Sequence, residues 1–221
     1  MILYKVKTRF QKILGNYRLT AKYLELHFIW NNYLKPKGWF ESKFKRMPVD
    51  KTGDPIPWFT YASIFFINQK LVGKSFSVFE FGSGNSTLFF ASRVKNIVSI
   101  EYDESYFNKI SEKLLEHENV TYNLATLGKD YYQQILNYKN EFEVIIIDGR
   151  ERNLCAKNCL EALTDNGIII WDNSDRKNYS EGYKFLQDNG FKKIDFMGHG
   201  PISTKEWQTS IYYRDGNCFD I

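Results

Sequence analysis

Short apolar runs and amphipathic segments alternate along the chain from Ser75 onward. This alternation is typical of a parallel sheet whose strands are joined by crossover helices. The expected strands are residues 76–81, 97–101, 120–124, 144–147, 167–171, 192–197 and 209–213. The expected helices between them are residues 87–94, 105–116, 131–138, 154–163 and 179–189.

The last two expected strands are joined by a segment without helical periodicity. Parallel neighbours need a long crossover connection, so this junction predicts an antiparallel pair at the end of the sheet. The pattern therefore predicts an α/β domain with a seven-stranded, mostly parallel sheet, an antiparallel last strand and helices on both faces.

A turn with two prolines, Asp-Pro-Ile-Pro at residues 54–57, interrupts the pattern before the first strand. Proline ends a preceding helix, and residues 58–71 then show helix-like apolar spacing. A length of 221 residues suits one domain with a modest appendage. We therefore expect a helical appendage over residues 1–56 and a single α/β domain over residues 57–221.

The net charge of +4 conceals an asymmetry along the chain. Residues 1–50 carry eleven Lys and Arg against three acidic residues and are rich in aromatic side chains. A segment of this kind can meet an anionic membrane surface, a nucleic acid or an acidic substrate. The alternative is a solvated helical face that caps the domain. The sequence leaves the oligomeric state open.

Other properties favour a soluble, cytoplasmic protein. No stretch reaches the roughly 18 uninterrupted apolar residues that a membrane span needs. Residues 1–10 interleave basic and apolar side chains and lack the apolar core of a secretion signal. The three cysteines cannot all pair within one chain, which fits a reducing compartment.

A glycine-rich turn follows the first expected strand and opens a helix. Gly82 permits the tight turn, and Gly84 lets a ligand approach the backbone closely. Glu101 ends the next strand, where a carboxylate can accept hydrogen bonds from the ribose hydroxyl groups of a ligand. Thr87 stands where dinucleotide-binding loops have a third glycine, which argues against an NAD-dependent oxidoreductase. The sequence therefore predicts an adenosyl-type cofactor.

Three segments carry a more specific resemblance: Glu-Phe-Gly-Ser-Gly-Asn-Ser-Thr at 80–87, Ser-Ile-Glu-Tyr-Asp at 99–103 and Ile-Ile-Asp-Gly at 146–149. Together they resemble the class I S-adenosylmethionine-dependent methyltransferases, over roughly residues 57–214. The resemblance implies a Rossmann-like fold and S-adenosylmethionine as cofactor. One departure is Ser86, which replaces the usual third glycine of that loop. The cofactor-binding residues implied are Glu80, Gly82, Ser83, Gly84, Asn85, Ser86, Glu101, Tyr102 and Asp148.

Acidic residues also follow two neighbouring expected strands: Asp148 after the fourth, and Asp172 with Asn173 after the fifth. Three hard oxygen ligands of this kind suit Mg²⁺ or another divalent cation. The arrangement is similar to metal-dependent O-methyltransferases, in which the metal lowers the pKa of an acceptor hydroxyl. The alternative is structural, with Asp148 capping a turn or touching the cofactor and Asp172-Asn173 forming an Asx-turn.

Asp148 and His199 are the candidate catalytic residues, and His199 lies in the turn between the last two strands. An imidazole there suits a general base that accepts a hydroxyl proton. We expect in-line methyl transfer to a small hydroxylated acceptor such as a sugar. The segment after the fourth strand lacks the Asn-Pro-Pro-Tyr type sequence found where base amino groups are methylated, which argues against a nucleic-acid acceptor. The alternative function is a non-catalytic binding module that docks through the basic N-terminal segment.

Overall fold

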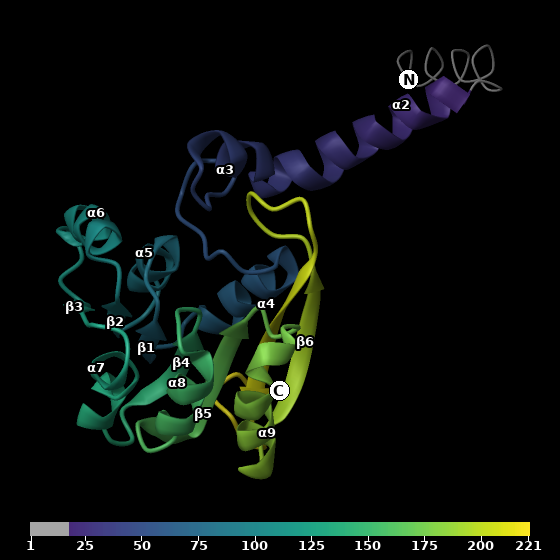
Figure 1. Ribbon diagram of the computed structural model, residues 1–221. Helices are drawn as coiled ribbons and strands as arrows, with labels where there is room; N and C mark the ends of the chain where they lie inside the picture. The colour runs from purple at the N-terminus through teal and green to yellow at the C-terminus, as the bar shows by residue number, and fades with distance from the viewer. Residues whose placement is uncertain (1–17) are drawn as a thin grey trace.

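The computed structural model describes residues 18–221 and contains a seven-stranded sheet. The strand order is β3-β2-β1-β4-β5-β7-β6, as predicted for a doubly wound sheet with an antiparallel end (Figure 1). The strands are β1 (Ser77–Phe81), β2 (Asn96–Glu101), β3 (Val120–Leu124), β4 (Phe142–Ile147), β5 (Leu163–Asp172), β6 (Lys192–Gly198) and β7 (Trp207–Tyr213).

Helices cover both faces of the sheet (Figure 1). Helices α4 (Tyr61–Leu71) and α5 (Asn85–Ala91) pack on one face, and α6 (Glu104–Leu114) lies beside α5 and β3. Helices α8 (Arg152–Asn158) and α9 (Ser180–Asp188) pack on the other face, where the short α7 (Lys129–Tyr132) joins them.

The central strands are mostly apolar because both of their faces are covered. In β4, Val144 and Ile146 point into the core under α4 and α5, whereas Ile145 and Ile147 point into the core under α7, α8 and α9. All four side chains are fully buried. This two-sided burial explains why the strand shows no polar alternation in the sequence.

The antiparallel pair at the end of the sheet is confirmed. Strand β7 is antiparallel to β5 and to β6, with Ile211 opposite Ile170 on one side and Ile194 on the other. Strand β6 therefore runs in the same direction as β1 to β5. Its carboxyl end, followed by His199, reaches the same edge of the sheet as the carboxyl ends of the parallel strands.

Two predicted helices differ from those in the structure. The segment 131–138 is divided between α7 and the 3-10 turn η3 (Gln134–Asn137) instead of forming one helix. In the segment 154–163 the helix ends at Asn158. The residues after it pair with the start of β4 instead, since the N–H of Glu141 donates to the carbonyl of Ala162, directly before β5. The shorter α8 leaves a ten-residue β5 that reaches its end at Asp172.

The N-terminal segment is helical and lies beside the edge that carries His199. It comprises α2 (Arg18–Ile29), the π-helical η1 (Trp30–Leu34), the 3-10 turn η2 (Lys35–Lys37) and α3 (Trp39–Lys45). Helix α2 projects away from the body of the molecule, at the upper right of Figure 1.

Residues 39–56 are attached to the α/β domain by specific contacts. The indole of Trp39 donates to the carbonyl of Ser203, and the Asn85 side-chain amide donates to the carbonyl of Pro48. The domain boundary at residue 57 stays a prediction. Within residues 18–221, no helix combines the length and the apolar character needed to cross a bilayer.

Candidate functional site

The residues singled out from the sequence meet at the carboxyl edge of the sheet. Strands β2, β1, β4 and β5 are consecutive neighbours, and they end at or directly before Glu101, Gly82, Asp148 and Asp172. In open α/β sheets ligands bind outside this edge, between the two neighbouring strands from which the chain continues in opposite directions across the sheet. Here these two strands are β1 and β4.

The turn after β1 packs tightly against the turn after β4. Gly82 has a φ of +90°, and a Cβ there would lie 2.6 Å from the Gly149 Cα. Only glycine tolerates both the left-handed conformation and this approach. The turn predicted from Gly82 is therefore present, and its immediate neighbour is the backbone of Gly149.

Glu80 lies beneath this turn and is fully buried. Its Oε2 accepts hydrogen bonds from Thr87 Oγ1 and Ser99 Oγ, both at 2.6 Å. Thr87 Oγ1 in turn accepts from the N–H of Gly84 at 3.0 Å, so Thr87 fixes the turn to the carboxyl group. Burial raises the pKa of Glu80 to about 7, against the lowering effect of the hydroxyl donors.

Two acceptor oxygens near the turn have no hydrogen-bond partner. Six buried polar side-chain atoms in the described part of the chain lack a partner, and Glu80 Oε1 and Asn85 Oδ1 are the two among them that can only accept. The amide orientation of Asn85 is fixed because its Nδ2 donates to the carbonyl of Pro48 at 2.5 Å. A buried acceptor without a donor is costly, so each of the two atoms could accept a hydrogen bond from a ligand.

Gly84 approaches a side chain from α6. A Cβ on Gly84 would lie 3.0 Å from the hydroxyl oxygen of Tyr106. The φ of Gly84 is 161°, which is extended backbone that any residue adopts. Burial raises the pKa of Tyr106, and the carboxylates of Glu101 and Glu80 raise it further. Tyr106 therefore faces the same acidic edge, and no pattern in the sequence marked it.

Glu101 is buried and accepts four hydrogen bonds from the protein. One oxygen accepts from the N–H of Ser83 at 3.1 Å and from its hydroxyl at 2.7 Å. The other oxygen accepts from the N–H groups of Tyr102 and Asp103 at 2.8 and 2.9 Å. The Ser83 hydroxyl also lies 2.6 Å from the Tyr122 hydroxyl, so it has a second possible partner. Glu101 thus ties the turn after β1 to the end of β2.

Tyr102 lies on the side of the edge formed by the turn after β4. Its hydroxyl accepts a hydrogen bond from Nε of Arg150 at 3.1 Å, and its ring packs edge-on against Tyr131. Arg150 and Tyr131 were not marked by the sequence patterns. Together with Tyr102 they place a cation and two aromatic rings beside the end of β2.

Asp148 and Asp172 are both bound by a single guanidinium group. Arg152, at the start of α8, donates to the Asp148 carboxylate at 3.0 Å and to the Gly149 carbonyl at 2.9 Å. It also donates to the backbone carbonyl of Asp172. Burial raises the pKa of both aspartates, Arg152 opposes this, and the Asp148 charge further raises the pKa of Asp172.

The structure gives no support to the metal site predicted at Asp148, Asp172 and Asn173, whose polar groups have partners within the protein. The carboxylate of Asp172 is buried and accepts from Trp207 Nε1 at 2.9 Å and Thr209 Oγ1 at 2.6 Å. Asn173 has a φ of +50° and forms a turn in which its carbonyl accepts from the N–H of Arg176. Within residues 18–221, no group of three or more His, Cys, Asp and Glu could hold a metal ion. Arg152 supplies the positive charge between the two strand ends.

His199 lies at the same edge and is partly exposed. Its carbonyl accepts from the N–H of Tyr61, which ties the turn after β6 to the start of α4. Its Nε2 lies 3.5 Å from the Glu206 carboxylate. The structure shows no hydrogen bond between His199 and either aspartate among the described residues.

Arg152 and Tyr106 are the main residues that the sequence analysis missed. A signal existed for Arg152, since it follows Asp148 by four residues and such pairs can meet on one side of a turn or helix. Tyr106 is one apolar position of an amphipathic helix, and the sequence does not show that its hydroxyl reaches Gly84.

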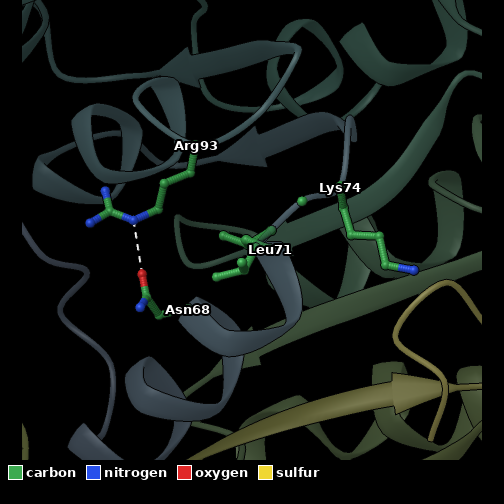
Figure 2. Close-up of a pocket in the computed structure, with 6 residues that line it drawn as sticks. Asn68, Leu71, Lys74 and Arg93 are labelled. Carbon is green, nitrogen blue, oxygen red and sulfur yellow. Dashed lines mark hydrogen bonds between the residues drawn. The ribbon is translucent and has the colours of Figure 1, made fainter.

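A separate pocket of about 230 Å³ lies at the opposite edge of the sheet (Figure 2). Gly73 and Lys74 precede β1, and Arg93 precedes β2, so this pocket is at the amino ends of the strands. Arg93 Nε donates to Asn68 Oδ1 at 2.9 Å, as the dashed line in Figure 2 shows. The pocket has no contact with the residues at the carboxyl edge.

Solved structures share this fold. Precorrin-6y C5,15-methyltransferase from Geobacter metallireducens has a TM-score of 0.58 and 12% identity, covering 78% of this chain and 95% of that one. An rRNA methylase from Streptococcus thermophilus has a TM-score of 0.54 and 18% identity, with coverages of 70% and 96%. A Streptococcus mutans protein solved with S-adenosylhomocysteine has a TM-score of 0.52 and 20% identity, with coverages of 69% and 96%.

No family model and no curated protein matches the sequence significantly. The structural similarities, at 20% identity or less, show the fold. The chain therefore has the Rossmann-like fold of class I S-adenosylmethionine-dependent methyltransferases, as the sequence motifs predicted.

Proposed function

We propose that the protein binds S-adenosylmethionine at the carboxyl edge of its sheet and transfers the methyl group to an acceptor. The observation that carries the proposal is the pair of unpartnered acceptor oxygens, Glu80 Oε1 and Asn85 Oδ1, beside the turn after β1. An amino group such as that of S-adenosylmethionine is a positively charged donor and suits two such acceptors. A pyrophosphate would be repelled by them, which supports S-adenosylmethionine over NAD.

The other residues of the edge suit the rest of the cofactor. The turn at Gly82 to Ser86 would lie against its methionine end, and the carboxylate of Glu101 would accept from its ribose hydroxyls. Glu101 is already saturated by donors, so the Ser83 hydroxyl would turn to its alternative partner, the Tyr122 hydroxyl. Tyr102 and the turn at Asp148 would flank the adenosyl group.

The reaction we propose is O-methylation of a small hydroxylated acceptor such as a sugar. When bound, S-adenosylmethionine supplies an electrophilic methyl group. Asp148 then acts as the general base that accepts the acceptor's hydroxyl proton, because Arg152 binds one of its oxygens and its side chain is 21% exposed. Burial raises the pKa of Asp148 toward the neutral range, which suits a base at physiological pH. His199 is the alternative base.

Calorimetry with S-adenosylhomocysteine, S-adenosylmethionine and NAD tests the cofactor. We expect the first two to bind and NAD not to bind. Glu80→Leu should abolish binding, and Glu143→Leu, at the start of β4 on the far edge, should leave it unchanged. Binding of NAD alone would overturn the proposal.

A methyl-release assay over a set of hydroxylated acceptors tests the reaction. With an acceptor in hand, Asp148→Asn should lower kcat by about 10²- to 10⁴-fold, the usual range for a general base, while the affinity for S-adenosylhomocysteine is retained. His199→Gln should then have a small effect. The reverse order would assign the base to His199. Cofactor binding without turnover on any acceptor would favour the non-catalytic binding module.

A further inference from the structure

Exposed apolar side chains are concentrated near the N-terminal end of the described chain. Among the side chains described, those of residues 21–221, sixteen large apolar ones are exposed, and seven of these lie between residues 23 and 44. Five of the seven are aromatic, whereas only two of the nine others are. The seven are Tyr23, Leu26, Phe28, Ile29, Trp30, Tyr33 and Phe44.

Four of these side chains, Tyr23, Leu26, Phe28 and Ile29, extend from the helix that projects from the body. Helix α2 points away from the sheet in Figure 1. The four side chains on it are 46–65% exposed. Tyr23, Leu26 and Trp30 follow the spacing of one helical face. Phe44, on α3, is 90% exposed and lies between Lys43 and Lys45.

The same segment is positively charged, and its charge is not neutralised within the chain. Five lysines elsewhere in the described chain form ion pairs with acidic side chains. In residues 21–46 of the described structure no basic side chain does so. The basic residues there are Lys22, Lys35, Lys37, Lys43, Lys45 and Arg46, against Glu25 and Glu41.

We propose that residues 18–46, the docking arm, bind the surface of an anionic lipid membrane. Aromatic and aliphatic side chains insert at the headgroup boundary, and lysines beside them are attracted to anionic lipids. Aromatic rings with a polar edge, such as those of Tyr23 and Trp30, favour this boundary. The net positive charge matches an anionic surface.

Two other occupants fit the surface less well. A second copy of the chain would bring two positively charged arms together, which electrostatic repulsion opposes. A nucleic acid would neutralise the lysines and stack on the aromatic rings, but Leu26 and Ile29 would gain little from it. Both side chains gain free energy when they enter a lipid boundary.

The docking arm also orients the rest of the molecule. Trp39 and Lys43 of α3 donate to the backbone carbonyls of Ser203 and Ile202 in the turn between β6 and β7. This turn belongs to the carboxyl edge of the sheet, so a docked arm holds that edge close to the membrane. The docking itself is independent of the proposed methyl transfer, and its test measures binding alone.

The test is co-sedimentation of the full-length protein with vesicles of phosphatidylcholine alone and of phosphatidylcholine mixed with phosphatidylglycerol. We expect binding to the mixed vesicles, weak binding to the neutral ones, and weakening by salt. The absence of binding to the mixed vesicles at low salt would overturn the proposal.

Paired variants assign the binding to the docking arm. Leu26→Ser/Ile29→Ser should weaken binding at least tenfold, and the control Val72→Ser/Leu115→Ser, at two more exposed positions, should not change it. Lys22→Gln/Lys45→Gln should weaken binding by about fivefold for each lysine removed. The control Lys129→Gln/Lys177→Gln removes two exposed lysines outside the arm and should have less effect.

Thermal melting of each variant checks the fold. The melting temperature of the Leu26→Ser/Ile29→Ser variant should stay unchanged, because both residues lie on α2, which projects from the body. Equal loss in the arm variants and their controls would overturn the proposal. So would a dimer in sedimentation equilibrium that disappears in Leu26→Ser/Ile29→Ser, since a second copy would then cover the arm. Tighter binding to single-stranded RNA than to the mixed vesicles would overturn it as well.

Discussion

Glu80 illustrates at the residue scale how burial prepares a group for a charged ligand. Its carboxyl group has no exposed surface, and one of its two oxygens has no partner. Burial therefore favours the neutral form, and the pKa is raised to about 7. A ligand that brings a positive charge to the free oxygen would favour the charged form. Binding of such a ligand would then be coupled to the loss of a proton.

We expect S-adenosylmethionine binding to release about half a proton at pH 7, because Glu80 would be about half protonated before binding and ionised afterwards. Calorimetry in buffers of different ionisation enthalpy measures this number. The release should fade above pH 8, where Glu80 is already ionised. Glu80→Gln should abolish it. An unchanged proton release in that variant would assign the proton to another group.

The two glycines of the turn after β1 have different physical roles. Gly82→Ala would place a Cβ against the Gly149 backbone with φ at +90°, and should cost on the order of 3 kcal/mol of unfolding free energy. Gly84→Ala meets only the Tyr106 hydroxyl, so it should cost less than about 1 kcal/mol. Urea unfolding measures both. Tyr106→Phe should relieve the cost of Gly84→Ala, and a cost that persists in the double variant would show that Tyr106 is not its cause.

The sequence predicted which residues of the candidate site lie at strand ends. Gly82, Glu101 and Asp148 could be found because their positions follow from apolar runs and the turns after them. The partners that complete the site could not. Tyr106 and Arg152 reach the site from helices, and which side of a helix faces a strand end depends on packing that the sequence does not display.

At the scale of elements, the strands were easier to predict than the helices beside them. The run 144–147 that became most of β4 is apolar because both faces of the sheet are covered. The helix expected at 154–163 ended early, because residues 161–163 pair with residues 140–142 across the sheet. That pairing joins segments about 20 residues apart, and local periodicity carries no signal for it.

Arg152 connects α8 to the ends of β4 and β5, and we expect its removal to destabilise the domain. Arg152→Met should lower the free energy of unfolding by about 3–5 kcal/mol, the range for a buried ion pair that loses one partner. Denaturant unfolding is the measurement. Lys157→Met on the same helix is the control, because its ion pair with Glu181 is exposed and should contribute at most about 1 kcal/mol.

Adding Asp148→Asn to Arg152→Met separates charge from packing. The second substitution removes the carboxylate that the first leaves without its partner, so the double variant should recover part of the lost stability. If the double variant is no more stable than Arg152→Met alone, Arg152 stabilises the domain through its hydrogen bonds to backbone carbonyls and not through the charge of Asp148.

At the scale of the whole molecule, charge is divided between two regions. Residues 1–50 carry a net charge of +8, while the remainder of the chain is acidic. Three of those acidic groups, Glu80, Asp148 and Asp172, are drawn together at the carboxyl edge. The basic docking arm lies outside the sheet, beside the turn after β6. The molecule thus has a cationic outer surface next to an acidic interior site.

The acidic site makes a prediction about stability and pH. Burial raises the pKa of Glu80, Asp148 and Asp172 above the values of the unfolded chain. The carboxyl groups of the unfolded chain have pKa values near 4. Between that pH and the raised pKa values of the folded state, the folded state binds more protons than the unfolded state. Stability is therefore greatest at the acidic side and is lost as pH rises through the folded pKa values. Asp50 and Asp103 have lowered pKa values and act in the opposite sense, below about pH 4.

We therefore expect the melting temperature of the ligand-free protein to fall by several degrees between pH 5 and pH 8. The full-length chain should be used, with thermal melting followed at constant ionic strength. Glu80→Gln should reduce the fall between pH 5 and about pH 7, because the amide cannot ionise. Saturating S-adenosylmethionine should also flatten it, since the cationic ligand stabilises the ionised carboxyl group. A melting temperature that rises from pH 5 to pH 8 in the ligand-free protein would show that these carboxyl groups are ionised without difficulty. The edge would then be more hydrated than the structure indicates.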